Sequence, residues 1–150
     1  MGRRGTKWSL VLALAATLLS VPVAQATAPT IVPAPSSDFT DTTSCGFDVA
    51  IHYTTSGETA KFFSDGMIIV TGPLAATFSA NGKTVTLNIA GPATITSDSV
   101  TGHGVGAGPT LLPNGQTTLG YNAGTVDISG PAGVIIHGHM LLDICAALAS

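Results

Sequence analysis

The chain has 150 residues, enough for one ordinary domain with its own core, and its net charge at pH 7 is −3. Three of its five basic residues lie at the start of the sequence, which leaves only Lys61 and Lys83 beyond them against eight acidic residues. Nucleic acids and anionic membranes require clustered positive charge, so we expect neither as a partner.

The first 26 residues have the pattern of a secretory signal peptide. Three basic residues precede an uncharged, apolar run over residues 8–23, and a small-x-small sequence ends at Ala26. A membrane anchor fits less well, because the run is shorter than about 18 residues and Pro22 interrupts its end. The pattern therefore predicts cleavage after Ala26 and a secreted, extracellular protein.

Residues 27–38 contain three prolines separated by small residues, which predicts an extended and poorly ordered leader. We expect a single domain over residues 39–150. Its first clear strand covers residues 45–54, where apolar and polar residues alternate. The apolar face of this strand consists of Phe47, Val49, Ile51 and Tyr53.

The two cysteines, Cys45 and Cys145, lie near the two ends of this domain. In an oxidising compartment we expect a disulfide between them. Such a bond closes a loop of about 100 residues and contributes roughly 4–5 kcal/mol in the chain-entropy model. The alternative is a reactive thiol pair, but no Cys-x-x-Cys spacing supports it.

Residues 66–97 predict a hairpin around Asn81-Gly82, a dipeptide that favours a two-residue type I′ turn. Gly72 and Gly91 then lie opposite each other. Because a proline follows each of these glycines, we expect the hairpin to bend sharply there. This register also gives one strongly apolar face, with the pairs Phe78/Val85, Ala76/Leu87 and Leu74/Ile89.

Residues 100–108 have glycine at every second position, which predicts a strand with one bare face. Turns at residues 113–115 and 122–124 predict short strands over residues 116–121 and 125–129. A last strand covers residues 134–145, and we expect Val126 to pair with Ile136 in it. No segment beyond residue 26 has a helical period.

These elements predict an all-β, antiparallel meander that forms a small barrel, with a two-sheet β-sandwich as the alternative and no helix in the secreted chain. A barrel of this kind can enclose a small apolar ligand. The expected lining consists of Phe47, Val49, Ile51, Val70, Leu74, Leu87 and Ile89.

The best candidate for a functional site in the sequence is the group of His137, His139 and Asp143. On a regular strand these side chains point to one face, and two histidines with a carboxylate are typical ligands of zinc or iron. The pattern resembles the first metal motif of cupins, although no second histidine motif follows. A further ligand would have to come from His103 or His52. No nucleophile motif occurs, so we assign no catalytic residue.

Three features together resemble those of an uncharacterised group of small secreted actinobacterial proteins. They are the segment from Asp143 to Leu148, the sequence Cys45-Gly46-Phe47, and a proline-rich leader after a signal peptide. The resemblance implies secretion, one disulfide between the N- and C-terminal parts, and an all-β fold. The resemblance identifies no catalytic or binding residues.

We therefore expect a secreted, non-catalytic binding or interaction protein without a cofactor, whose partner is a small apolar ligand or an extracellular protein. One alternative is a metal-dependent enzyme that uses His137 and His139 with zinc or iron. Another is a self-assembling cell-surface protein, which the low charge and the abundance of Gly, Thr and Ala favour.

Overall fold

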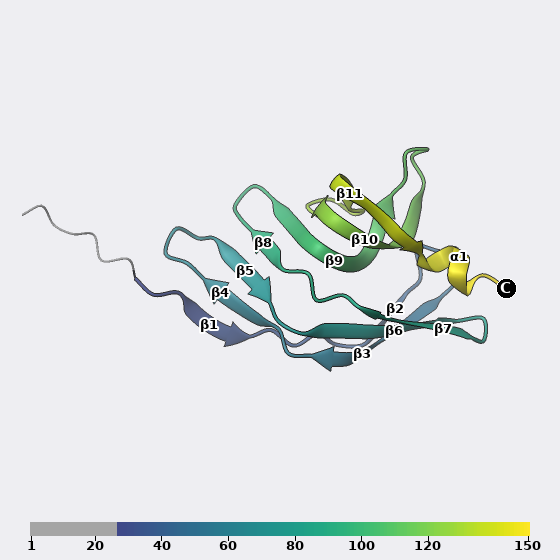
Figure 1. The fold of residues 1–150 in the computed structure, drawn as a ribbon, viewed down its shortest axis with the longest axis horizontal. Coiled ribbons are helices and arrows are strands. Elements are labelled where there is room, and N and C mark those ends of the chain that lie inside the picture. Colours follow the sequence, from purple (N-terminus) through teal and green to yellow (C-terminus); the bar gives the residue numbers. More distant parts are fainter. Residues whose placement is uncertain (1–26) are drawn as a thin grey trace, which may run out of the picture.

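The computed structural model describes residues 27–150, which form two antiparallel β-sheets and one short helix (Figure 1). The predicted signal peptide lies outside the described residues. The larger sheet has the order β1-β4-β5-β8-β9-β10-β11, and the smaller has the order β2-β3-β6-β7. The elements are β1 (Thr30–Pro33), β2 (Phe39–Asp41), β3 (Val49–Ser56), β4 (Thr59–Phe62), β5 (Ile68–Thr71), β6 (Leu74–Ala80), β7 (Lys83–Asn88), β8 (Ala93–Ile95), β9 (Val100–Leu111), β10 (Thr117–Asp127), β11 (Val134–Asp143) and α1 (Ile144–Leu148).

Neither sheet closes into a barrel, so our first expectation for the architecture was wrong and the two-sheet alternative fits. The physical reason is where the chain changes sheets. The chain passes from β3 to β4, from β5 to β6 and from β7 to β8. In each of these three pairs one strand belongs to the smaller sheet and the other to the larger sheet. As a result β1 and β11 lie at opposite edges of the larger sheet instead of meeting (Figure 1).

The chain bends between the sheets at glycines, as the opposed Gly72 and Gly91 predicted. A Cβ atom on Gly72 would lie 2.5 Å from the carbonyl oxygen of Gly57, and one on Gly91 would collide with the carbonyl oxygens of His103 and Val105. Only a residue without a side chain lets the backbones approach this closely. The predicted hairpin is therefore divided, with β6 and β7 in the smaller sheet and β5 and β8 in the larger.

The predicted register of this hairpin is confirmed on both sides of the bend. Ala80 pairs with Lys83 beside the turn, and Ile68 pairs with Ile95 at the far end. Asn81 has φ +51° and Gly82 has φ +74°, as a type I′ turn requires. The apolar pattern determines this register because a slip of one residue would move every core side chain to the solvent face.

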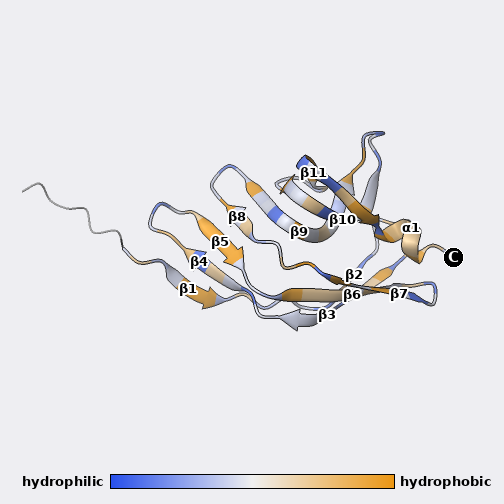
Figure 2. Cartoon of the chain, in the orientation of Figure 1, coloured by the Kyte–Doolittle hydropathy of each residue, from blue (hydrophilic) through white to orange (hydrophobic). Residues whose placement is uncertain are grey.

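The hydrophobic core lies between the two sheets and includes most of the side chains that we expected to line the interior. Val70 is an exception: it lies on β5 and is not among the side chains of this core. Figure 2 shows apolar residues on β5 and along β6, and hydrophilic residues at the tip of the β6–β7 hairpin. The buried core consists of Val49, Ile51, Ala76, Phe78, Ile89, Leu119, Ile144 and Leu148.

The helix α1 covers one end of this core and corrects our expectation that the secreted chain has no helix. Its side chains Ile144 and Leu148 are fully buried. Asp143 caps its first turn by accepting a hydrogen bond from the N–H of Ala146 (3.0 Å). Asn81 Nδ2, from the hairpin tip, donates to the carbonyl oxygen of Leu148 (2.9 Å). A helix of five residues is too short to show a period, but the aspartate cap was a usable signal.

Three further expectations need correction. The leader, residues 27–38, is not poorly ordered throughout, because the strand β1 lies within it and every residue of β1 pairs with β4. Residues 122–124 do not form a turn, since β10 runs unbroken through them. At the end of β10, Val126 pairs with Ile135 and not with Ile136, because a β-bulge shifts the register between Thr125 and Val126.

The predicted disulfide between Cys45 and Cys145 is present, with 5.1 Å between the two Cα atoms, and it connects the segment before β3 to α1. Replacing both cysteines by serine should lower the free energy of unfolding by about 4 kcal/mol, because the bond closes a loop of 100 residues. Denaturant unfolding of the two proteins would measure the difference. A loss below about 1 kcal/mol would contradict the chain-entropy argument.

Gly124 has φ +122° and pairs with Gly104 of β9 and Gly138 of β11. A Cβ atom on it would collide with the carbonyl oxygen of His137. We expect Gly124→Ala to prevent folding or to cost at least about 3 kcal/mol. Gly130→Ala should be tolerated, because the nearest atom to its Cβ would lie 3.8 Å away. Thermal unfolding followed by circular dichroism compares the two variants, and equal midpoints would refute the expectation.

Candidate functional site

The predicted metal ligands do not share one face of the structure. His137 and His139 lie on the same face of β11, and both are exposed to solvent. Between them and Asp143 a register shift inserts one extra residue into β11. Such a bulge reverses the alternation of side chains, so Asp143 lies on the opposite face.

Asp143 instead supports the end of the chain. Its Oδ1 accepts hydrogen bonds from Thr118 Oγ1 (2.7 Å) and from the N–H of Ala146 (3.0 Å). The other histidines lie on different sheets, His103 on β9 and His52 on β3. Across residues 27–150 no group of three or more His, Cys, Asp and Glu side chains is placed to hold a metal ion.

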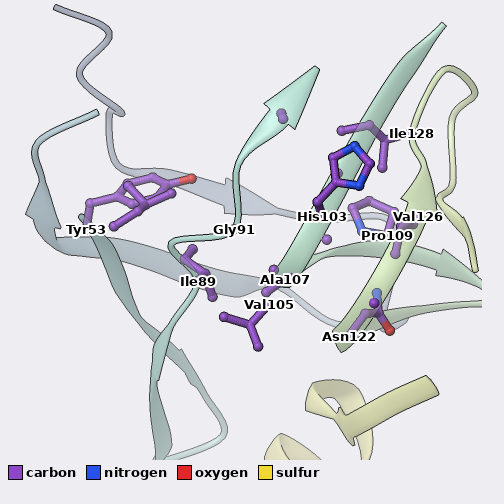
Figure 3. Close-up of a pocket in the computed structure, with 17 residues that line it drawn as sticks. Tyr53, Ile89, Gly91, His103, Val105, Ala107, Pro109, Asn122, Val126 and Ile128 are labelled. Atoms are coloured by element: carbon purple, nitrogen blue, oxygen red, sulfur yellow. The ribbon is translucent and has the colours of Figure 1, made fainter. Parts of the chain in front are cut away.

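A cavity of about 200 Å³ lies between β9, β10 and residues of the smaller sheet (Figure 3). Exposed residues line one end of it, including His103 and Ile128, so it opens to solvent there. A cavity of about 150 Å³ can hold benzene, so this one has room for a small ring compound. Most of the larger side chains that line it are apolar: Leu74, Ile89, Val105, Val126 and Ile128.

The cavity follows the edge of β9 that faces away from β10. On this edge β8 pairs with β9 only over residues 100–102, and backbone hydrogen bonds extend the contact to Pro92 and Gly91. Within the described part of the chain, the next backbone partner along this edge is Gly133, which bonds to Pro109 and Leu111. The gap between these two contacts exposes both faces of β9 to the cavity, which explains why consecutive residues of this strand line it.

A second cavity, of about 130 Å³, continues between the two sheets. Tyr53, Ile89 and Ala107 line both cavities, so the two are adjacent. Phe39 and Asp41, from β2, line the second cavity. The pair of cavities therefore extends from the solvent-exposed end of β9 toward the hydrophobic core.

Tyr53 contributes one of the polar groups in a lining that is mainly apolar. Burial, followed by the negative charge of Glu58, raises the pKa of the Tyr53 hydroxyl above its ordinary value, so the hydroxyl keeps its proton at neutral pH. The backbone N–H of Tyr53 donates to Asp38 Oδ1 (2.8 Å), and Asp38 Oδ2 lies 2.5 Å from His52 Nδ1. These contacts on the outer face anchor the strand position from which Tyr53 reaches the cavity.

Sequence reasoning missed the buried polar side chain of the lining, Asn122, because it placed this residue in a turn. Asn122 lies in the middle of β10, is only 5% exposed and lines the first cavity. The usable signal was an asparagine flanked at a distance of two residues by Gly120 and Gly124, which is the spacing of one strand face.

No protein-family model, curated protein or solved structure matches this chain. Among the described residues there is no helix with the length and apolar character needed to cross a membrane. The geometry of the cavity is therefore the observation that bears on function.

Asp41, beside the second cavity, is buried, and its carboxylate accepts four hydrogen bonds from Thr43 and Ser44. Burial raises the pKa of Asp41, but these hydrogen bonds outweigh burial and hold the pKa below the ordinary value of 3.8. A lowered pKa in the folded state stabilises the protein above pH 3.8. This stabilisation is lost as the pH falls through the lower, folded-state pKa.

We therefore expect Asp41→Asn to be less stable than the unaltered protein at neutral pH, and the difference to shrink below about pH 4. Urea unfolding at a series of pH values would measure it. Asp48→Asn serves as the matched control, because Asp48 is exposed. A difference that stays constant from neutral to acidic pH would show that the Asp41 carboxylate does not stabilise the fold through its charge.

Proposed function

We propose that this protein is a secreted, non-catalytic binding protein that holds a small apolar ligand in the cavity beside β9. The observation that carries this proposal is the half-open cavity of about 200 Å³, lined mainly by apolar side chains and glycine backbone. Secretion is supported by the signal-like first 26 residues and by the Cys45–Cys145 disulfide, a bond typical of oxidising compartments.

The size of the cavity limits the affinity that a ligand can reach. A ring compound that loses about 200 Å² of apolar surface gains roughly 5 kcal/mol from burial. The cost of ordering the ligand reduces this gain. An affinity in the upper micromolar to millimolar range follows for a ligand bound by apolar contact alone. A tighter ligand must also make polar contacts.

Binding of toluene, a small apolar ring, tests the proposal. In backbone amide NMR spectra of the oxidised protein, toluene at millimolar concentration should shift the signals of Val105, Gly106 and Val126. Ala93→Phe should abolish these shifts, because it adds a ring at a position that lines the cavity. Ala50→Phe, an exposed change on β3, should leave them intact. Absence of shifts, or shifts scattered over the surface, would overturn the proposed function.

A further inference from the structure

The strand β11 forms a long sheet edge that lacks the usual protection against further pairing (Figure 1). The edge strands are β1 and β11 in the larger sheet and β2 and β7 in the smaller. Natural proteins protect such edges with short strands, prolines and lysines, because an unpaired strand can bind another. β1 has four residues and ends at Pro33, β2 has three, and β7 begins at Lys83. β11 has ten residues, and residues 134–142 include no proline, lysine or carboxylate.

The middle of β11 is open to solvent on both faces, because the four consecutive residues from Ile136 to His139 are all exposed. Two β-bulges enclose the segment His137–Met140, since Ile136 and Leu141 have no partner in the register with β10. Bulges bend an edge strand away from a regular ladder, so only this short segment is free to pair with another strand. A backbone pairing of four residues is weak by itself.

The sequence of β11 is nearly symmetric about Gly138, which points to a second copy of this strand as the partner. If two copies pair antiparallel around Gly138, each residue lies opposite one of its own kind. Such an interface has two-fold symmetry, so every contact occurs twice. All eight acidic residues lie outside residues 134–142, so the pairing brings no two carboxylates of β11 opposite each other. The opposed pairs are Val134/Leu142, Ile135/Leu141, Ile136/Met140 and His137/His139.

The same pairing brings four histidines together on one face. His137 and His139 lie on the same face of β11, and both are exposed. Residues directly opposite in an antiparallel pair share a face, with Cβ atoms about 4.5–5.5 Å apart. His137 of each copy therefore lies beside His139 of the other. Two residues that are two positions apart on a strand are separated by about 7 Å, so all four imidazoles surround one position.

One copy alone supplies only two of these ligands. Within residues 27–150 no group of three or more His, Cys, Asp and Glu side chains is placed to hold a metal ion. His103 is in the same row as His137, but it lies two strands away, with Thr125 of β10 between them. Imidazole is a typical ligand of zinc and copper, and a structural zinc site has four ligands. The half-site on β11 therefore needs a second copy to be complete.

We propose that β11 pairs with β11 of a second copy around Gly138, and that the dimer binds a divalent transition-metal ion through His137 and His139 of both copies. The metal ion supplies the stability that a backbone pairing of four residues lacks. Zinc and copper(II) fit these ligands, whereas magnesium prefers oxygen. This inference goes beyond the proposed function, because no residue of β11 lines either apolar cavity.

Sedimentation velocity of the oxidised protein, prepared without a histidine tag, tests the proposal. We expect the dissociation constant of the dimer to be at least about tenfold lower with zinc chloride than with EDTA, and magnesium chloride to have no effect. Titration calorimetry should give one zinc ion for every two chains. Hydrogen exchange should slow at those amides of residues 137–140 that point away from β10, since pairing covers this edge.

Variants of exposed residues connect the dimer to the histidines and to the strand. His137→Ala and His139→Ala should each remove the effect of zinc, whereas His52→Ala, on β3, should leave it intact. Ile136→Lys keeps both histidines but places a lysine on the edge, and it should weaken the zinc-dependent dimer at least about tenfold. Ile31→Lys, an equally exposed change on β1, is its control. Circular dichroism checks folding, and asparagine replaces alanine at a histidine position whose alanine variant does not fold.

Each part of the proposal has a result that would overturn it. One zinc ion per single chain, or zinc binding that is lost in His103→Ala, would overturn the shared site. A dimer that is equally tight with zinc and with EDTA would overturn the role of the metal. A zinc-dependent dimer that survives Ile136→Lys, or that leaves the exchange of the β11 amides unchanged, would overturn the pairing along this strand. Absence of a dimer under every condition would overturn the whole proposal.

Discussion

The fold depends on how closely its backbones approach one another along the line where the sheets bend. Gly72 and Gly91 occur where the chain passes between sheets, and Gly104, Gly124 and Gly138 continue the line across β9, β10 and β11. At most of these positions a Cβ atom would collide with a neighbouring backbone. The bend makes room for the core between the sheets, and the cavity lies beside the same line of glycines. The close approach of the backbones therefore determines the position of both the core and the cavity.

Sequence reasoning succeeded where one local pattern had one physical solution. The Asn81-Gly82 turn and the apolar alternation around it determined the hairpin register, and the position of the two cysteines near the ends of the predicted domain indicated their bond. It failed where one strand deviates from regular alternation. The two bulges of β11 are small local insertions with no sequence signature of their own, yet they change the partner of Val126 and the face of Asp143.

The candidate site was likewise predicted only in part. The every-second-residue glycines of β9 correctly predicted a bare strand face, but the sequence could not say which partner strand would lie beside it. The position of Asn122 in the cavity wall depends on β10 running unbroken opposite Gly106, which the sequence did not indicate. The group of His137, His139 and Asp143 carried the more familiar motif, but its side chains share one face only if the strand is regular, and β11 is not.

The position of α1 has a consequence for how the chain reaches its folded state. Ile144 and Leu148 seal the end of the core, and the hairpin tip at Asn81 holds the last helical carbonyl. Synthesis from the N-terminus delivers these residues after all the strands. Until they arrive, the end of the sandwich stays open to its surroundings. The fold is thus completed only when residues 144–148 are in place, and truncation before Ile144 would leave a protein with an unsealed core.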